Sequence, residues 1–96
     1  MRSNTMTDIV ITAVNELTGF STSDIAVAPD ATLMDVVQAC IDEEARKTGA
    51  PMGELQDASI TDDATGRKLN PHLTLADAGV QTGDVIKFMP KMYAAR

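Results

Sequence analysis

The chain has 96 residues, 44% of them hydrophobic but only 3% aromatic, which predicts one small globular domain with an aliphatic core and excludes a disordered chain. Its 14 acidic against 8 basic residues give a formal net charge of −6, which argues against nucleic acid and anionic membrane surfaces as partners. No apolar run approaches the roughly 20 residues of a membrane span, so we expect no direct membrane insertion.

A first strand is predicted over residues 8–15, where β-branched side chains alternate in a period of two. The face that carries Ile9 and Ile11 has the larger side chains, and we expect it to point into the core. A second strand is predicted over residues 23–28, close enough to the first to form a hairpin with it.

The strongest periodic signal predicts one main helix over about residues 32–48. Apolar residues recur at spacings of three and four from Leu33 to Ala45, which draws one apolar stripe along the helix. Thr32 is the expected N-cap, with Asp35 three residues later in a near capping box. Gly49 can adopt the left-handed conformation that ends the helix. A single helix cannot bury its stripe alone, so we expect the remaining elements to cover it.

Three further strands are predicted over residues 58–61, 67–69 and 85–89, and a short helical turn over about residues 74–79. The turn would place Leu75 against the core. Pro90 is expected to end the last strand, because proline lacks the amide that a ladder needs. We expect the strand after the helix to pair with the hairpin, and the last strand to lie in the middle of the sheet beside the first.

These elements predict an α+β roll, with a mixed sheet of about five strands packed on one helix. We place a single domain at residues 8–90, between a disordered N-terminal tail of residues 1–7 and a C-terminal tail of residues 91–96.

Three stretches carry a resemblance to a known fold family: VAPDATLMDVV, RKTGAP and GRKLNPHLTLADAGVQTGDVIKF. The first runs from a strand into a Thr-capped helix, the second ends that helix, and the third supplies a short turn and the closing strand. In their order and spacing the chain resembles ubiquitin-like β-grasp proteins over nearly its whole length. The resemblance implies that the roll is a ubiquitin-like β-grasp.

The end of the chain departs from the best-known members of that family. It reads MYAAR, without the Gly-Gly that conjugated ubiquitins and sulfur carriers of this fold activate, which counts against a protein modifier or sulfur carrier. In the stretch LTLADAGVQTGDVIKF, and in lacking the Gly-Gly, the chain most resembles the YukD/EsaB group. These small bacterial proteins accompany type VII secretion systems, whose membrane component EccD carries a related domain. The same stretch also resembles the small ubiquitin-fold subunit of bacterial multicomponent monooxygenases, and this alternative stays open.

The residues that could carry chemistry lack the companions that chemistry requires. His72 is the only histidine and has no second metal ligand beside it. Cys40 falls on the apolar stripe, where we expect an inert, buried thiol, and a single cysteine fits a reducing cytoplasm. Asp62 and Asp63 read as a turn because no EF-hand spacing follows them. We therefore expect a cytoplasmic protein that is not an enzyme, with no cofactor and no metal.

The expected partner is another protein, bound on the outer face of the sheet. If Ile86 and Phe88 point inward, Lys87 and Met89 point outward, and Lys68 lies on the short neighbouring strand. We expect Lys68, Lys87 and Met89 to form the docking surface, with the surrounding acidic surface setting partner choice.

Two weaker candidates for a docking surface remain. The acidic run of residues 42–44 could meet a basic partner, although such a run is more often a solvated helix face. Met34, Met52, Met89 and Met92 would form an adaptable binding patch if they gathered on one exposed face, but gap-filling is the usual use of methionine.

Overall fold

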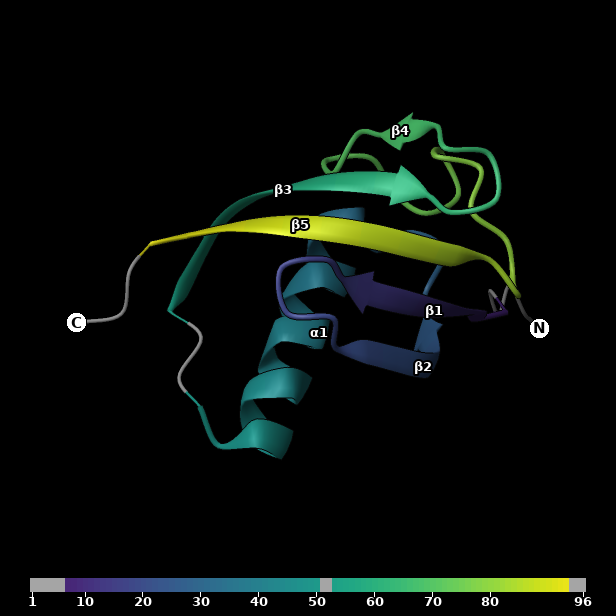
Figure 1. Cartoon of the computed structure of the whole chain (residues 1–96). Helices are drawn as coiled ribbons and strands as arrows, with labels where there is room; N and C mark the ends of the chain where they lie inside the picture. The colour runs from purple at the N-terminus through teal and green to yellow at the C-terminus, as the bar shows by residue number, and fades with distance from the viewer. Residues whose placement is uncertain (1–6, 51–52, 94–96) are drawn as a thin grey trace.

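The computed structural model describes residues 7–50 and 53–93, in which a five-stranded sheet curls around one helix (Figure 1). In chain order the elements are β1 (Ile9–Asn15), β2 (Ser21–Val27), α1 (Leu33–Thr48), β3 (Glu54–Asp62), β4 (Lys68–Leu69) and β5 (Val85–Tyr93). The sheet order is β2-β1-β5-β3-β4, with β1 and β5 parallel and the other neighbours antiparallel. The predicted α+β class, mixed sheet and single main helix are confirmed.

The position of β5 decides the topology. It lies between β1 and β3, so the prediction that the last strand is central and beside the first is confirmed. The prediction that the strand after the helix pairs with the hairpin was wrong, because β5 occupies the edge of β1 that β3 would need. β3 pairs with β5 and β4 instead.

The core lies between the sheet and α1 and is mainly aliphatic. Ile11 is 2% exposed, so the predicted inward face of β1 is confirmed, and Leu75 is fully buried as expected. Burying each large aliphatic side chain is worth roughly 1.5–3 kcal/mol, which makes this layer the main source of stability. The buried hydrophobic residues are Ile11, Ala13, Leu33, Val36, Val37, Cys40, Ile41, Ala58, Ile60, Leu69, Leu75, Ala78, Val80, Ile86 and Phe88.

Both ends of α1 are capped as predicted. The amide of Asp35 donates to Oγ1 of Thr32 at 3.2 Å, and the amide of Thr32 donates to Oδ2 of Asp35 at 3.1 Å, which completes a capping box. Gly49 takes φ +74° and its amide donates to the carbonyl of Ala45, so the helix closes in a left-handed cap.

A distant loop is fastened to the first turn of α1. The amides of Leu33 and Met34, which have no acceptor inside the helix, donate to the carbonyls of Leu73 and Pro71 at 3.0 and 2.9 Å. The short helical turn that follows, predicted at about residues 74–79, contains one helical hydrogen bond, from the amide of Ala78 to the carbonyl of Thr74. The helix N-terminus therefore holds the connection between β4 and β5 in place.

β3 and β5 extend past the rest of the sheet as a two-stranded ribbon (Figure 1). Among the described residues, β4 pairs with β3 only at Ile60 and Thr61, and β1 pairs with β5 only from Val85 to Phe88. Beyond these points Glu54–Ser59 and Met89–Tyr93 pair with each other. We call these two segments the arm.

The arm corrects two predictions. β3 begins at Glu54 and not at Ala58, and β5 runs through Pro90 to Tyr93, so part of the predicted C-terminal tail is strand. The remaining tail residues, 94–96, and most of the predicted N-terminal tail, 1–6, lie outside the described residues.

The backbone pattern explains why Pro90 does not end β5. The carbonyl of Phe88 accepts from Glu16 beside β1 at 2.8 Å, whereas the carbonyl of Val85 accepts from Asp63 beside β3 at 3.0 Å. Even-numbered residues of β5 therefore turn their backbone groups toward β1, and odd-numbered residues turn theirs toward β3. The nitrogen of Pro90 points away from β3, so its missing amide removes no bond from that ladder.

Candidate interaction surface

The sheet brings two of the predicted docking residues into one row on its outer face. Thr61 of β3 is the register partner of both Lys87 on β5 and Lys68 on β4. Neighbouring strands lie about 4.8 Å apart, so the two lysines stand on strands roughly 10 Å apart with a threonine between them. Met89 follows in the next outward position of β5, opposite Ser59. The structure thus gathers Lys68, Lys87 and Met89 on one face.

Lys87 forms an ion pair that the sequence pattern did not indicate. Its Nζ lies 3.0 Å from Oδ1 of Asp63, and both side chains remain 44% exposed. The hydrogen bond and the negative charge of Asp63 raise the pKa of Lys87 above its usual value. Asp63 was predicted only as a turn residue; it reaches Lys87 because its own amide donates to Val85 and draws the turn against β5.

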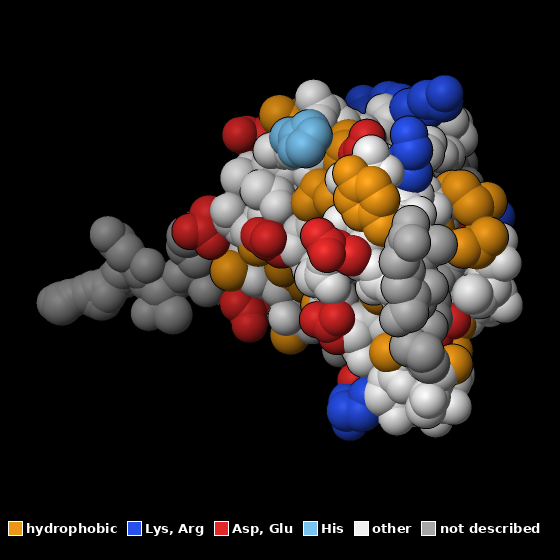
Figure 2. Space-filling model, turned by 90° about the vertical axis from the view of Figure 1, so that its left-hand side faces the viewer, with side chains coloured by type: hydrophobic (Ala, Val, Ile, Leu, Met, Phe, Trp, Pro, Cys, Tyr) orange, Lys and Arg blue, Asp and Glu red, His pale blue; other side chains and the backbone are white. Residues whose placement is uncertain are grey.

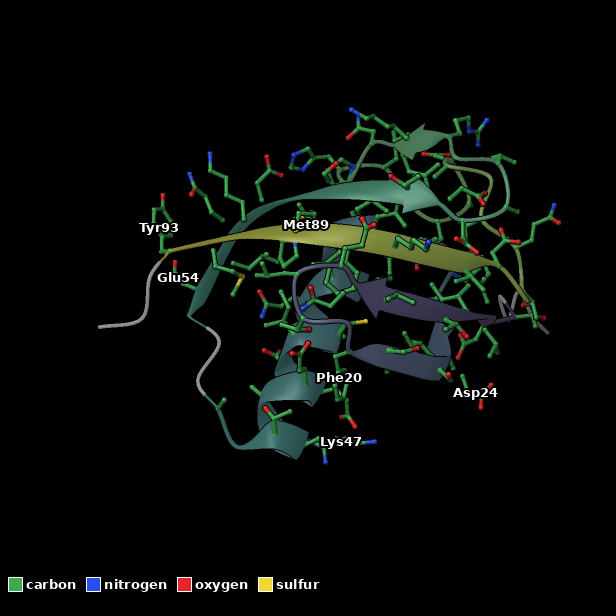
Figure 3. The ribbon with its side chains drawn as sticks, viewed as in Figure 1. Phe20, Asp24, Lys47, Glu54, Met89 and Tyr93 are labelled. Carbon is green, nitrogen blue, oxygen red and sulfur yellow. The ribbon has the colours of Figure 1, made fainter. Side chains whose placement is uncertain are left out.

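Met89 is the exposed apolar centre of this face. Its side chain is 43% exposed and lies on the ribbon of β5, with Tyr93 farther along at the tip of the arm (Figure 3). A shallow hollow of about 430 Å³ opens beside it, lined by Asp57, Ala58, Ser59, Met89, Pro90 and Lys91. The apolar side chain of Met89 beside the charged Asp57 and Lys91 makes the hollow suited to receive a side chain that protrudes from a partner.

The basic residues are distributed unevenly over the described part of the chain. Arg46 and Lys47 lie on α1, where both pair with Glu43. The other four, Arg67, Lys68, Lys87 and Lys91, lie on β4, on β5 or just before β4. Figure 2 shows Lys and Arg side chains gathered mainly along the top of one face, with Asp and Glu spread below them. Three of these side chains, Lys68, Lys87 and Lys91, therefore place positive charge on β4 and β5, although the chain as a whole has a net charge of −6.

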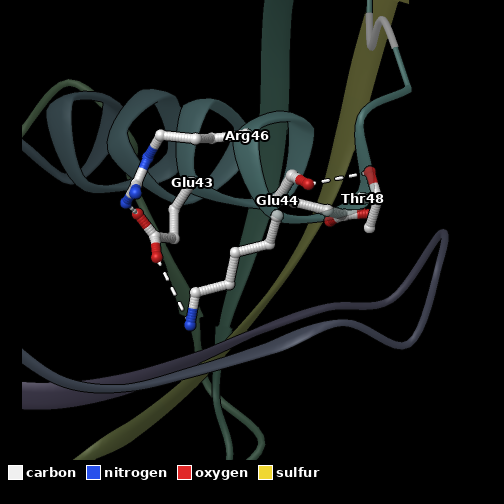
Figure 4. A network of polar contacts seen from close by, with 5 residues as sticks. Glu43, Glu44, Arg46 and Thr48 are labelled. Atoms are coloured by element: carbon white, nitrogen blue, oxygen red, sulfur yellow. Dashed lines mark hydrogen bonds and ion pairs between the residues drawn. The ribbon is translucent and has the colours of Figure 1, made fainter.

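The acidic run of residues 42–44 does not form one continuous docking surface. Glu43 is held between Arg46 and Lys47, the latter at 3.4 Å (Figure 4). Asp42 accepts from the side-chain amide of Gln38 at 2.9 Å. Two cations thus balance the charge of Glu43, and of this pair only Asp42, whose hydrogen-bond donor is neutral, offers a negative charge to a basic partner.

Glu44 is not part of a solvated face at all. It is 5% exposed, and its Oε1 accepts from Nδ2 of Asn15 at 3.0 Å; Asn15 itself is 1% exposed. The amide of Leu17 donates to Oδ1 of Asn15, so this buried pair ties α1 to the turn after β1. The signal was available in the sequence, because Glu44 follows Cys40 by four residues and Ile41 by three and so falls on the apolar stripe.

Cys40 and His72, the other side chains considered for catalysis or metal binding, lie in different parts of the fold. Cys40 is buried, and burial raises the pKa of its thiol to about 11, which keeps it protonated at neutral pH. His72 lies exposed in the loop after β4, where its amide donates to Oδ1 of Asn70 at 2.9 Å. Within residues 7–50 and 53–93, no three His, Cys, Asp or Glu side chains converge as a metal site would require.

The predicted methionine patch reduces to one residue. Met34 and Met92 are partly buried and pack against the core, while Met89 points outward. Met52 lies outside the described residues.

In the part of the chain that the structure describes, no helix has the length and apolar character needed to cross a bilayer.

Comparisons with known proteins bear on the fold. No protein-family model matches the sequence, and no curated protein matches it significantly. The UBL domain of yeast Ddi1 is similar over 98% of this chain and 100% of its own, with 19% identity and a TM-score of 0.54. The ubiquitin-like domain of EccD5 from Mycobacterium xenopi is similar over 91% of this chain and 98% of its own, with 15% identity and a TM-score of 0.59.

A third similar structure is part of a larger assembly. A chain of the MycP5-free ESX-5 inner membrane complex is similar over 94% of this chain but only 22% of its own length, with 14% identity and a TM-score of 0.58. At these identities the similarity establishes the fold, and the predicted ubiquitin-like β-grasp is confirmed.

Proposed function

We propose that this protein is a non-catalytic, ubiquitin-like interaction module of the bacterial cytoplasm, and that it serves a type VII secretion system as an accessory in the manner of the YukD/EsaB group. Support comes from the similarity to the EccD5 domain and to a chain of the ESX-5 inner membrane complex. The stretch of residues 73–88, which is similar to the YukD/EsaB group, points in the same direction.

The observation that carries the proposal is the outer face of the sheet. Lys68 and Lys87 flank Thr61 in one row, and the exposed Met89 follows beside a shallow hollow. A flexible thioether adapts to the shape of a partner, and the lysines fix its orientation through charge. The partner presents an apolar side chain to the hollow and acidic groups to the lysines, while the acidic surface elsewhere on the chain disfavours other orientations.

The test is partner capture by the full-length chain from cells of its own host, with mass spectrometry to identify what is bound. We expect components of a secretion system to be recovered. The paired substitution of Lys87→Ala and Met89→Ala should lower recovery about tenfold or more, since central contacts of an interface carry most of its free energy. Gln38→Ala, on the exposed face of α1, is the matched control and should leave recovery unchanged.

Other outcomes would replace the proposal. Equal recovery by the paired variant would remove the outer face as the docking site. Co-purification with a di-iron hydroxylase would favour a structural role in a multicomponent monooxygenase, and a lysine-linked adduct of this chain would favour a protein modifier.

A further inference from the structure

The arm has two edges that lack a neighbouring strand in the described structure. On β3 the pairing with β4 stops at Ile60, and on β5 the pairing with β1 stops at Phe88 (Figure 1). An open edge with a regular row of N–H and C=O groups can be extended by a strand of another molecule. The residues immediately past Ile60 and Phe88 therefore decide whether the sheet can grow.

On β3 the deciding residue is Ala58. The amide of Asp62 donates to Arg67, just before β4, and the amide of Asp63 donates to Val85 of β5, so even-numbered residues from Asp62 back to Ala58 turn their backbone toward the β4 side. The amide of Ala58 thus points to the open edge, where Oδ1 of the exposed Asp57 accepts from it at 2.8 Å. The donor that a new strand would need is already occupied.

A bulge reinforces this effect. The register with β5 shifts between Leu55 and Asp57, which leaves Gln56 as an extra residue on β3. Bulges bend a strand and interrupt the regular row of backbone groups. The open edge of β3 therefore lacks a continuous stretch that a second strand could follow.

On β5 the corresponding residue is Pro90. It is the first residue past the pairing with β1 whose backbone points to that side, and proline has no amide to donate. The free edge of β2, at the margin of the sheet, is interrupted too: Asp24 takes φ +56° where the register with β1 shifts. Each of these three edges therefore carries its own interruption.

We propose that Asp57 and Pro90 keep the arm from pairing, edge to edge, with the arm of a second copy of this chain. Two identical edges can pair antiparallel about a two-fold axis, so a second copy at high concentration is the most available strand donor. With both edges closed, partners meet the arm through its outer face, which carries Met89 and Lys91. This inference goes beyond the proposed function, because it holds whichever protein the face binds.

The test compares the full chain with three variants in sedimentation equilibrium from micromolar to millimolar concentration. The variants are Asp57→Ala, Asp57→Asn, and Asp57→Ala combined with Pro90→Val. Asparagine removes the charge but keeps an oxygen that can accept from Ala58, so it is the matched control. We expect the combined variant to dimerise with a dissociation constant at least about tenfold lower than that of the unaltered chain. Asp57→Ala should shift the constant less in the same direction, and Asp57→Asn should leave it unchanged.

Amide hydrogen exchange tests the geometry of the contact. In concentrated samples of the combined variant, the amides at positions 58 and 90 should become protected, while amides of α1 keep their exchange rates. The proposal is overturned if the combined variant is folded, by circular dichroism, and stays monomeric throughout. If Pro90→Val prevents folding, Asp57→Ala decides, because Asp57 is exposed; an unchanged mass for that variant would overturn the proposal for β3. Dimerisation of Asp57→Asn to the same extent as Asp57→Ala would show that charge, and not the occupied amide, keeps the copies apart.

Discussion

The two faces of β5 differ as much as any two regions of this molecule, although their residues alternate along one strand. Ile86 and Phe88 face α1 and are 0% and 1% exposed, whereas Lys87 and Met89 face outward, opposite Thr61 and Ser59. The inner face is apolar and filled; the outer face is partly polar and hollowed. The inward residues therefore stabilise the fold, and the outward ones are those that we propose to bind a partner, so the outer face can change with little effect on the core.

The largest expected effect comes from emptying the inner face. Phe88→Ala should lower the free energy of unfolding by about 3–5 kcal/mol, because a large buried side chain is lost and its cavity does not fully collapse. Met89→Ala, one residue away on the outer face, should cost less than about 1 kcal/mol. Urea denaturation followed by circular dichroism measures both. Similar losses for the two variants would contradict the division between the faces.

A second prediction concerns the buried polar pair of Asn15 and Glu44. Asn15→Ala should lower the free energy of unfolding by about 1–3 kcal/mol, because the buried carboxylate of Glu44 loses its donor. In a double-mutant cycle with Glu44→Ala, the second substitution should cost much less once the first is present. Strictly additive losses would mean that the two side chains do not support each other.

A third prediction concerns pH and the buried thiol. Burial raises the pKa of Cys40 from 9.0 to about 11, so the unfolded chain releases this proton before the folded chain does. The contribution is complete below pH 9.0 and is lost as the pH rises toward about 11. The free energy of unfolding should therefore fall through this window, and more steeply for the unaltered chain than for Cys40→Ala. Equal slopes in denaturation measured across the window would contradict the assignment.

The smallest expected effect is on the outer face. Lys87→Gln breaks the ion pair with Asp63, which is open to solvent, so the midpoint of urea denaturation should not move measurably. The same substitution should weaken partner capture, and the difference from the unaltered chain should shrink as salt is added. A clear loss of stability would show that this face also supports the fold.

Local signals in the sequence predicted the elements that depend on near neighbours. Thr32 and Gly49 bound the helix because their partners lie within four residues. Pro90 was misread as the end of β5, because whether a proline breaks a strand depends on which neighbour its nitrogen faces. Glu44 was read by its charge and not by its place on the apolar stripe, and its partner Asn15 lies 29 residues away.

The candidate surface was predictable to the same degree. The period of two along β5 was enough to turn Lys87 and Met89 outward, but the distance of Lys68 from them depends on the pairing of β3 with β5 and β4, and the predicted pairing of β3 was wrong. The ion pair between Lys87 and Asp63 was not predictable, because it depends on how the turn after β3 folds back onto β5. The arm was not predicted, because its two segments form strands only by pairing with each other, and neither segment has a strong strand pattern in its own sequence.

The place of β5 in the sheet also bears on how the chain acquires its structure. β5, which joins the hairpin to β3, is the last strand of the sheet in chain order, so the sheet cannot close until β5 has been synthesised. Contacts across such long sequence separations slow folding, because the ends must first find each other. Until then the hairpin and the amphipathic helix keep their apolar sides uncovered, and this exposure favours aggregation of the unfinished domain.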